Sequence, residues 1–293
     1  MVAINYQNAD GASVDLSTES AYLLQGVTGF ESPKSNLYTA KIPGQDGATM
    51  TGSDLDKKER TITGEIIVNS AVDLPGFRRT LEIAFSTKVD GVLNYTENGV
   101  SKQSDCRVET VAFAAPTALS QKFDITLLCA NPFWHDVAES ADEIALWLSS
   151  FEIDSADGFE IGAADGMEFG QRAPSVIVDV ENPGDVPCGM RVIFCAAATV
   201  VNPSIFNVNT REYFQINKTL QGGETVEVNT KFGQKSVTGT LNGQTLNYFN
   251  YAGLPGSTFL QLGVGSNPLR YNADSGLANL NVTIRYSPQY LGV

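Results

Sequence analysis

Alternating polar and apolar positions dominate the last third of the chain, residues 207–293. Stretches such as Val226-Glu227-Val228-Asn229-Thr230 and Asn279-Leu280-Asn281-Val282-Thr283-Ile284 place an apolar side chain at every second position. Three turn signals lie between the stretches: Gly222-Gly223, Asn242-Gly243 and Asn267-Pro268. Short strands separated by turns at this spacing are typical of a β-sandwich. The pattern therefore predicts a mainly β domain at the C-terminal end.

The first 137 residues show the same two-residue period. Residues 60–68, 106–113 and 121–128 alternate apolar and polar side chains, as half-buried strands do. Residues 92–97 read as a further strand that runs into an Asn98-Gly99 turn. We therefore expect a second β-sandwich in the N-terminal half of the chain.

One helix interrupts these N-terminal strands. Asp73 can cap its N-terminus, and Pro75 falls near the first turn, where a missing N–H group costs nothing. Apolar side chains then recur at helical spacing: Leu74, Phe77, Leu81, Ala84 and Phe85. This stripe predicts a helix that packs on the sheet, while Arg78 and Arg79 point elsewhere.

The boundary between the two halves follows residue 130. The stretch Asn131-Pro132-Phe133-Trp134-His135-Asp136 breaks the strand pattern, because proline cannot extend a ladder of hydrogen bonds. We expect an N-terminal sandwich with one helix at residues 1–137, a linker at 138–149 and a C-terminal sandwich at 150–293. Residues 138–148 fit either a strand or a short helix, and their pattern does not separate the two.

A tandem repeat of eight residues opens the C-terminal part. Residues 155–162 are followed by a near copy at 163–170, and each copy carries the Asp-Gly signal of a tight turn. Two copies are too few for a solenoid. Asp-rich turns raise the question of calcium, but the ligand spacing and the terminal Glu of an EF-hand are absent. We therefore expect no metal site and no cofactor.

The acidic net charge of the chain makes some kinds of binding partner unfavourable. The 293-residue chain has 19 basic and 33 acidic residues, a net charge of −14, and no run of Lys or Arg longer than two. This balance argues against nucleic-acid binding through a basic patch and against docking on an anionic membrane. No apolar stretch approaches the length of a membrane span, and residues 1–6 do not resemble a signal peptide. We expect a protein that is made and folded in a cytoplasm.

The four cysteines fit that compartment as scattered, reduced thiols. They are Cys106, Cys129, Cys188 and Cys195, and three of them lie in or beside apolar runs. Buried small hydrophobes are the ordinary interpretation of such cysteines. The spacing leaves a Cys188–Cys195 disulfide open.

Catalytic motifs are missing. The sequence has one histidine, His135, and no Gly-x-Ser-x-Gly motif whose serine could act with it as a nucleophile. It also has no glycine motif of the kind that binds phosphate or a dinucleotide. We expect no catalytic residue, although plentiful acidic residues leave a glycan-cleaving carboxylate pair open. Tyr248, Phe249 and Tyr251 could stack on a sugar ring, but in an alternating β chain such aromatics are more often core or interface residues.

Seven short motifs follow one another along nearly the whole chain: Gly26-Val27-Thr28-Gly29-Phe30, Ile42-Pro43-Gly44-Gln45-Asp46-Gly47-Ala48, Arg60-Thr61-Ile62-Thr63-Gly64-Glu65-Ile66, Arg78-Arg79, Cys129-Ala130-Asn131-Pro132-Phe133-Trp134, Phe159-Glu160-Ile161-Gly162 and Tyr290-Leu291-Gly292-Val293. In this order they resemble the distal tail protein (Dit) family of long-tailed, siphovirus-type phages. Position 131 is Asn where that family has Asp, a departure that keeps a turn-forming residue.

The resemblance implies a structural hub of a virion tail tip, made in the cytoplasm of a bacterial host. The N-terminal sandwich would form a hexameric ring, and a galectin-like or carbohydrate-module-like sandwich would project outward. The implied partners are other copies of the chain, the tail tube protein, the tape measure protein, a tail-associated lysin or fibre, and a receptor-binding protein. The alternatives are a carbohydrate-binding module that touches host cell-wall glycan and, further off, a glycan-degrading enzyme.

Ring closure needs one patch that meets a different patch on the next subunit. The glycine-rich loop 44–54 can stay flexible until a partner orders it. Our candidate interface residues are Gly44, Gln45, Asp46, Gly47, Gly52, Arg78 and Arg79. After the strand-ending proline, Phe133 and Trp134 are expected to plug the bottom of the first core.

Overall fold

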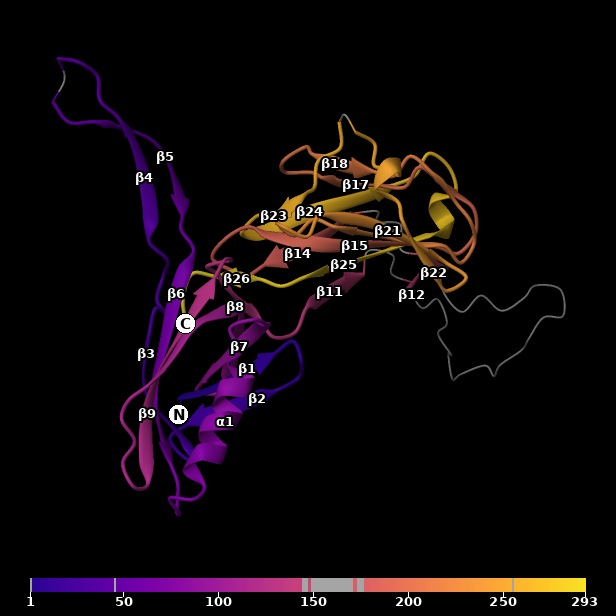
Figure 1. Ribbon diagram of the computed structural model, residues 1–293. Helices are drawn as coiled ribbons and strands as arrows, with labels where there is room; N and C mark the ends of the chain where they lie inside the picture. Colours follow the sequence, from indigo (N-terminus) through magenta and orange to yellow (C-terminus); the bar gives the residue numbers. More distant parts are fainter. Residues whose placement is uncertain (1, 45, 144–146, 149–170, 173–176, 255) are drawn as a thin grey trace, which may run out of the picture. The chain divides into compact units, whose positions relative to one another are not determined.

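The computed structural model describes residues 2–44, 46–143, 147–148, 171–172, 177–254 and 256–293. Its contacts divide the chain into two units, Met1–Ala138 with Gln289–Val293, and Glu139–Pro288 (Figure 1). Strands dominate both units, and α1 (Leu74–Ala84) is the one α-helix among the described residues. The expectation of a mainly β protein with one helix in its N-terminal half is thereby confirmed.

The first unit is built on a nine-stranded sheet in the order β26-β10-β8-β7-β1-β2-β3-β6-β9. Its strands are β1 (Val2–Asn8), β2 (Ser13–Ser17), β3 (Tyr22–Thr28), β6 (Lys58–Ile67), β7 (Asp90–Glu97), β8 (Val100–Phe113), β9 (Ser120–Cys129), β10 (Trp134–Asp136) and β26 (Gln289–Tyr290). Because β9 also pairs with β8, the sheet closes on itself. The two layers expected of a sandwich therefore belong to one closed sheet.

Apolar side chains fill the inside of this closed sheet. Ile62 and Ile66 of β6, and Phe123 and Leu127 of the adjacent strand β9, all point into the core and are buried. The helix α1 adds its own buried stripe: Leu74, Leu81 and Ala84. Asp73 stands at the N-cap as expected, but its side chain makes no capping hydrogen bond.

The last residues of the chain return to the first unit. In β26, Tyr290 pairs with Trp134 of β10, and the Tyr290 hydroxyl lies 3.2 Å from a carboxylate oxygen of Asp136. The Lys102 ammonium lies 3.4 Å from the centroid of the Tyr290 ring. The sequence-based division at 150–293 assigned these residues to the second sandwich, because their pairing partner is about 150 positions away and leaves no local signal.

The second unit is a sandwich of two sheets. The larger has the order β11-β25-β15-β20-β21-β22 with β23 beside β15, and the smaller has the order β14-β24-β17-β18. The larger sheet consists of β11 (Ser140–Glu143), β15 (Cys188–Ala196), β20 (Thr225–Asn229), β21 (Ser236–Leu241), β22 (Gln244–Asn247), β23 (Gln261–Leu262) and β25 (Leu280–Tyr286). The smaller consists of β14 (Ile177–Asn182), β17 (Ser204–Asn207), β18 (Tyr213–Gln215) and β24 (Gly265–Asn272). One buried cluster, which includes Phe194, Val282, Ile205 and Leu269, joins side chains of both sheets.

Short elements complete the second unit: β12 (Trp147–Leu148), β13 (Gln171–Arg172), β16 (Val200–Val201), β19 (Thr219–Leu220) and the 3-10 turns η1 (Phe249–Tyr251) and η2 (Leu277–Asn279). The strands β11 and β12 answer the strand-or-helix question that the sequence left open. Because β11 pairs with β25, part of the expected linker at 138–149 belongs to the second unit. The tandem repeat at 155–170, with its calcium question, lies outside the described residues.

Two further sequence features look different in the structure. Asn267-Pro268, read as a turn, lies inside β24. Proline is tolerated there because β17 pairs with β24 only from Leu269 onward, so position 268 has a strand on one side alone. The thiols of Cys188 and Cys195 are free, so no disulfide joins them.

Candidate assembly surface

The most exposed element of the first unit is a long hairpin made of β4 (Ser35–Ala40) and β5 (Thr49–Leu55). It forms a separate two-stranded sheet and extends beyond the closed sheet of its unit (Figure 1). Part of the expected loop 44–54 is therefore strand. The sequence pattern missed β5 because neither face of the hairpin is buried by this chain, so apolar residues do not alternate there.

The register of the hairpin gives it two different faces. Leu55 pairs with Ser35, Leu37 with Ser53, and Met50 with Thr39. Directly paired residues of an antiparallel ladder lie on the same face, so these six side chains share one face, which we call the apolar face. On it, Leu37, Met50 and Leu55 are 58%, 60% and 37% exposed. Apolar side chains of this size are more usual in a buried surface.

The other face of the hairpin is polar. Asn36 pairs with Asp54, and Ala40 pairs with Thr49. The Tyr38 hydroxyl donates a hydrogen bond of 2.8 Å to Asp54, which raises the pKa of the Tyr38 hydroxyl. The polar face thus carries a side-chain hydrogen bond of its own, whereas no described element of the first unit pairs with the hairpin or buries its apolar face.

Two of the predicted loop residues shape the tip of the hairpin. Gly44 and Gly47 adopt φ angles of +83° and +87°, a region that L-amino acids rarely occupy. A Cβ atom at either position would meet no atom within 4 Å, so the glycines serve backbone conformation and not close packing. Asp46 at the tip and Gly52 in β5 are exposed, and Gln45 lies outside the described residues.

The two predicted helix residues lie elsewhere in the unit. Arg78 forms a 3.0 Å ion pair with Glu82 and places its guanidinium 4.6 Å from the Phe113 ring centroid. Arg79 is exposed beside it. Figure 1 shows α1 and the hairpin at opposite ends of the first unit. The structure therefore does not bring the two arginines together with the hairpin tip.

Trp134 occupies the centre of an aromatic cluster in the first core. It is fully buried, and its ring lies 5.2 Å from Phe30 and 6.0 Å from Tyr95, measured between centroids. Its indole N–H donates to the Phe30 carbonyl over 3.3 Å. The neighbouring Phe133 is only half-buried. The indole ring thus packs against residues of two other segments of the unit.

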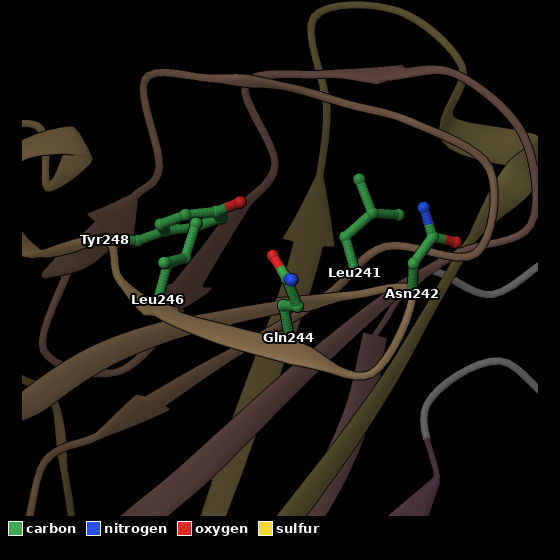
Figure 2. A pocket seen from close by; sticks show the side chains of 5 residues that line it. All are labelled: Leu241, Asn242, Gln244, Leu246 and Tyr248. Atoms are coloured by element: carbon green, nitrogen blue, oxygen red, sulfur yellow. The ribbon is translucent and has the colours of Figure 1, made fainter.

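The second unit has a small pocket beside the β21–β22 hairpin, about 320 Å³ in volume. Figure 2 shows its lining: Leu241, Asn242, Gln244, Leu246 and Tyr248. Tyr248 is nearly buried, because its ring packs flat over Gly239, where a Cβ atom would come within 2.1 Å of the ring. Phe249 stacks on Phe259, and Tyr251 meets Tyr248 edge-on. These aromatics pack on one another more than they present open ring faces.

The single histidine of the chain, His135, lies beside polar side chains of β8. His135 lies 3.9 Å from Asp105 and 3.2 Å from the Gln103 side chain, all on neighbouring strands. Within the described residues, His, Cys, Asp and Glu side chains form no group of three or more that could hold a metal ion. Among the described helices, none combines the length and apolar character needed to cross a membrane.

Two family models match the chain, one in each unit. The model described as a phage tail protein RIFT-related domain matches residues 9–129. The model described as the C-terminal domain of a siphovirus-type tail component matches residues 183–290. No curated protein matches this chain.

Solved structures share the fold over nearly the whole length. The crystal structure of the Dit protein of phage SPP1 has a TM-score of 0.70 at 13% identity, covering 98% of this chain and 99% of that one. A chain of the phage P2 baseplate, in its activated conformation with Ca, has a TM-score of 0.59 at 11% identity and covers 98% of both chains. At such identities the likeness shows the fold alone. The family rests on the two matched models, which lie in order and in separate units, and by them the chain belongs to the siphovirus-type distal tail protein (Dit) family.

Proposed function

We propose that this chain is a ring-forming hub at the tip of a siphovirus tail. In this proposal six copies close a ring through their first units, beneath the tail tube and tape measure proteins. The ring then carries a tail-associated lysin or fibre and a receptor-binding protein. Two facts about relatives support a hub: the SPP1 protein is described as a paradigm of a hub adsorption apparatus, and the P2 chain comes from a baseplate. A structural, non-enzymatic role follows from the family.

The observation that carries the proposal is the uncovered hairpin. A two-stranded hairpin alone in water is at best marginally stable, and it needs further strands or packing to persist. Among the described strands, β4 and β5 pair with each other alone, so each has an unpaired edge, and Leu37, Met50 and Leu55 on the apolar face are exposed. An exposed apolar face beside unpaired strand edges is a surface on which another protein chain can pack and form strand hydrogen bonds. If the hairpin of each copy meets a different surface on the next, the contact is heterologous and repeats around a ring.

Light scattering after size-exclusion chromatography tests this proposal. The wild-type chain should elute as a species near six times its 31.4 kDa mass. Leu37→Lys combined with Met50→Lys puts two charges on the apolar face and should give monomers. The matched control, Asn36→Lys with Ala40→Lys, puts the same two charges on the polar face and should leave the ring intact.

A wild-type chain that stays monomeric at every concentration would contradict the ring and favour the carbohydrate-binding alternative. That alternative predicts saturable binding of the monomer to purified host cell-wall glycan. Release of reducing sugar from the same glycan, abolished by replacing one Asp or Glu, would instead make the protein an enzyme. Equal loss of the ring in the apolar-face variant and in its control would show that charge, not the apolar face, matters.

A further inference from the structure

The first unit buries one arginine. Arg60 in β6 takes an inward-facing position between strands and is 1% exposed. Its guanidinium lies 4.0 Å from the Trp134 ring centroid, and one terminal nitrogen donates to the Pro132 carbonyl over 3.0 Å. The other terminal nitrogen donates to the Ser104 hydroxyl and to the sulfur of Cys129, the latter over 2.7 Å. A full positive charge therefore sits inside the core.

No carboxylate balances this charge. Among the described residues, no Asp or Glu oxygen comes within ion-pair distance, 4.0 Å, of the Arg60 guanidinium. The Glu31 carboxylate contributes to the electrostatic field at Arg60, but it forms an ion pair with Lys58, whose Nζ lies 2.8 Å from its Oε1. Asp105 is largely exposed and faces His135. Burying an isolated ion is costly enough that proteins pair or neutralise it, so Arg60 needs a counter-ion.

Among the described residues, the acidic group in contact with the guanidinium is the thiol of Cys129. It is fully buried at the end of β9, and Cys106 of the adjacent strand β8 is buried beside it. Ser104 and Cys129 accept from the same terminal nitrogen of Arg60, and the Arg60 Nε has no hydrogen-bond partner among the described residues. The Cys129 sulfur therefore lies directly against a buried guanidinium that is not fully hydrogen-bonded.

We propose that Cys129 is an ionised thiolate and serves as the counter-ion of Arg60. The Cys106 thiol donates its hydrogen bond to this thiolate, and Ser104 and Trp134 close the site from the remaining sides. The ion pair then fixes the turn from β9 to β10, because Arg60 also holds the Pro132 carbonyl in that turn. The sequence indicates no other function for this ion pair. Because the pair lies in the core, its role is to stabilise the fold of the first unit.

The expected effects on each group agree with this assignment. The hydrogen bond from Cys106, and then the charge of Arg60, lower the pKa of Cys129 against the opposing effect of burial. The same hydrogen bond and burial raise the pKa of Cys106, so the proton stays there. The other charged groups near the site are Lys58 of β6, Asp105 of β8, His135 of β10, and Glu31 in the segment between β3 and β4.

The second unit supplies an internal comparison. Cys188 is equally buried, at the start of β15, but no guanidinium contacts its sulfur among the described contacts. Burial raises the pKa of Cys188 to about 11, so it is a neutral thiol at neutral pH. The proposal thus gives two buried cysteines opposite charge states in one chain.

Ultraviolet absorbance of the full-length protein tests the proposal, because a thiolate absorbs in the far ultraviolet and a thiol does not. Near pH 7.5, Cys129→Ser should remove the absorbance of one thiolate per chain, while Cys188→Ser should remove none. The wild-type chain should lose this absorbance in one step as pH falls from about 9 to about 5, without any substitution. Cys106→Ser, with one thiolate left, should move that step by at least a few tenths of a pH unit.

Equal absorbance of the wild type and Cys129→Ser near pH 7.5 would overturn the proposal. So would a wild-type titration with no step below about pH 8. The second measurement needs no variant, so it decides the question even if Cys129→Ser fails to fold. Arg60→Lys keeps a positive charge and should keep the thiolate, whereas Arg60→Met should abolish it in any chain that remains folded.

Discussion

The two units of this protein place their arginines and their exposed apolar side chains differently. The second unit packs an apolar core between two sheets, leaves apolar side chains such as Phe232 exposed in turns, and pairs Arg191 on its surface with Glu139 and Glu227 at 3.0 and 2.8 Å. The first unit leaves an apolar hairpin face uncovered and buries an arginine against a cysteine. Under the ring proposed above, other copies complete the first unit, whereas the second unit needs no partner to cover its core.

The largest expected change in stability comes from Trp134, which holds the first core together. Trp134→Ala should lower the free energy of unfolding of the first unit by about 3–5 kcal/mol, the usual cost of such a truncation in a core. Hydrogen exchange read by mass spectrometry separates the units: peptides of β6 and β9 should exchange faster, and peptides of β15 and β25 should not. Unchanged exchange in β9 would place Trp134 outside the core.

The two units should also differ, by a smaller amount, in how their free energies of unfolding depend on pH. The pKa of Cys129 in the folded state is lowered to about 6, below its value of 9.0 in an open chain. A lowered pKa stabilises the fold above the unfolded pKa, and that stabilisation is lost as pH falls through the folded pKa. The free energy of unfolding of the first unit should therefore fall by about 3 kcal/mol between about pH 9 and about pH 6.

The second unit should behave differently over the same range. The raised pKa of Cys188, about 11, destabilises the fold only as pH rises above 9. Urea unfolding of the first unit can be followed by Trp134 fluorescence in a Trp147→Phe background, since the chain has two tryptophans. Cys129→Ser should flatten the pH dependence of that transition; an unaltered pH dependence would assign it to another group, such as His135.

The C-terminal strand should have a still smaller effect, confined to the first unit. Tyr290→Ala removes the ring beneath the Lys102 ammonium and the hydroxyl that contacts Asp136. Together these contacts are worth about 1–2 kcal/mol. Tyr290→Phe keeps the ring and should recover part of the loss in thermal unfolding. A loss that appears in the second unit instead would contradict the pairing of β26 with β10.

The smallest effect is expected when the second unit is cut out. Residues 139–288 keep β11 on the edge of β25, and β25 is the strand that a fragment starting at residue 150 would leave uncovered. The fragment 139–288 should fold alone and give well-dispersed amide NMR signals, with no loss of stability against the same unit in the full chain. Poor dispersion would show that the second unit depends on the first.

Sequence patterns predicted the elements whose two faces have different surroundings inside one chain. The helix at Leu74–Ala84 and the strands around Ile62, Ile125 and Val228 each have one buried face and one more exposed face. Their apolar residues therefore recur with the period of a helix or a strand, and the sequence predicts both the type and the place of each element. The hairpin has no buried face in one copy, and β26 pairs with a distant segment, so neither leaves a local pattern. Such elements depend on information that a single sequence does not contain.

The site around Arg60 did leave a signal. Arg60 falls on the same side of β6 as Ile62 and Ile66, and Cys129 falls on the same side of β9 as Ile125 and Leu127. A charged residue in an otherwise apolar register marks a buried ion. The register of β6 with β9 pairs Arg60 with Leu127, so Cys129 is a diagonal neighbour that the sequence alone does not single out. The predicted interface residues Arg78 and Arg79, by contrast, carried no positional signal beyond their charge.

Hydrogen exchange in the hairpin itself tests the central claim most directly. The protein would be compared at concentrations where it is monomeric and where it is assembled, with peptides of β4 and β5 read against peptides of β15. If the copies join through the apolar face of the hairpin, assembly should slow amide exchange in β4 and β5 at least tenfold and leave exchange in β15 unchanged. An assembled ring whose hairpin amides exchange as fast as those of the monomer would contradict the claim that the uncovered apolar face is what joins the copies.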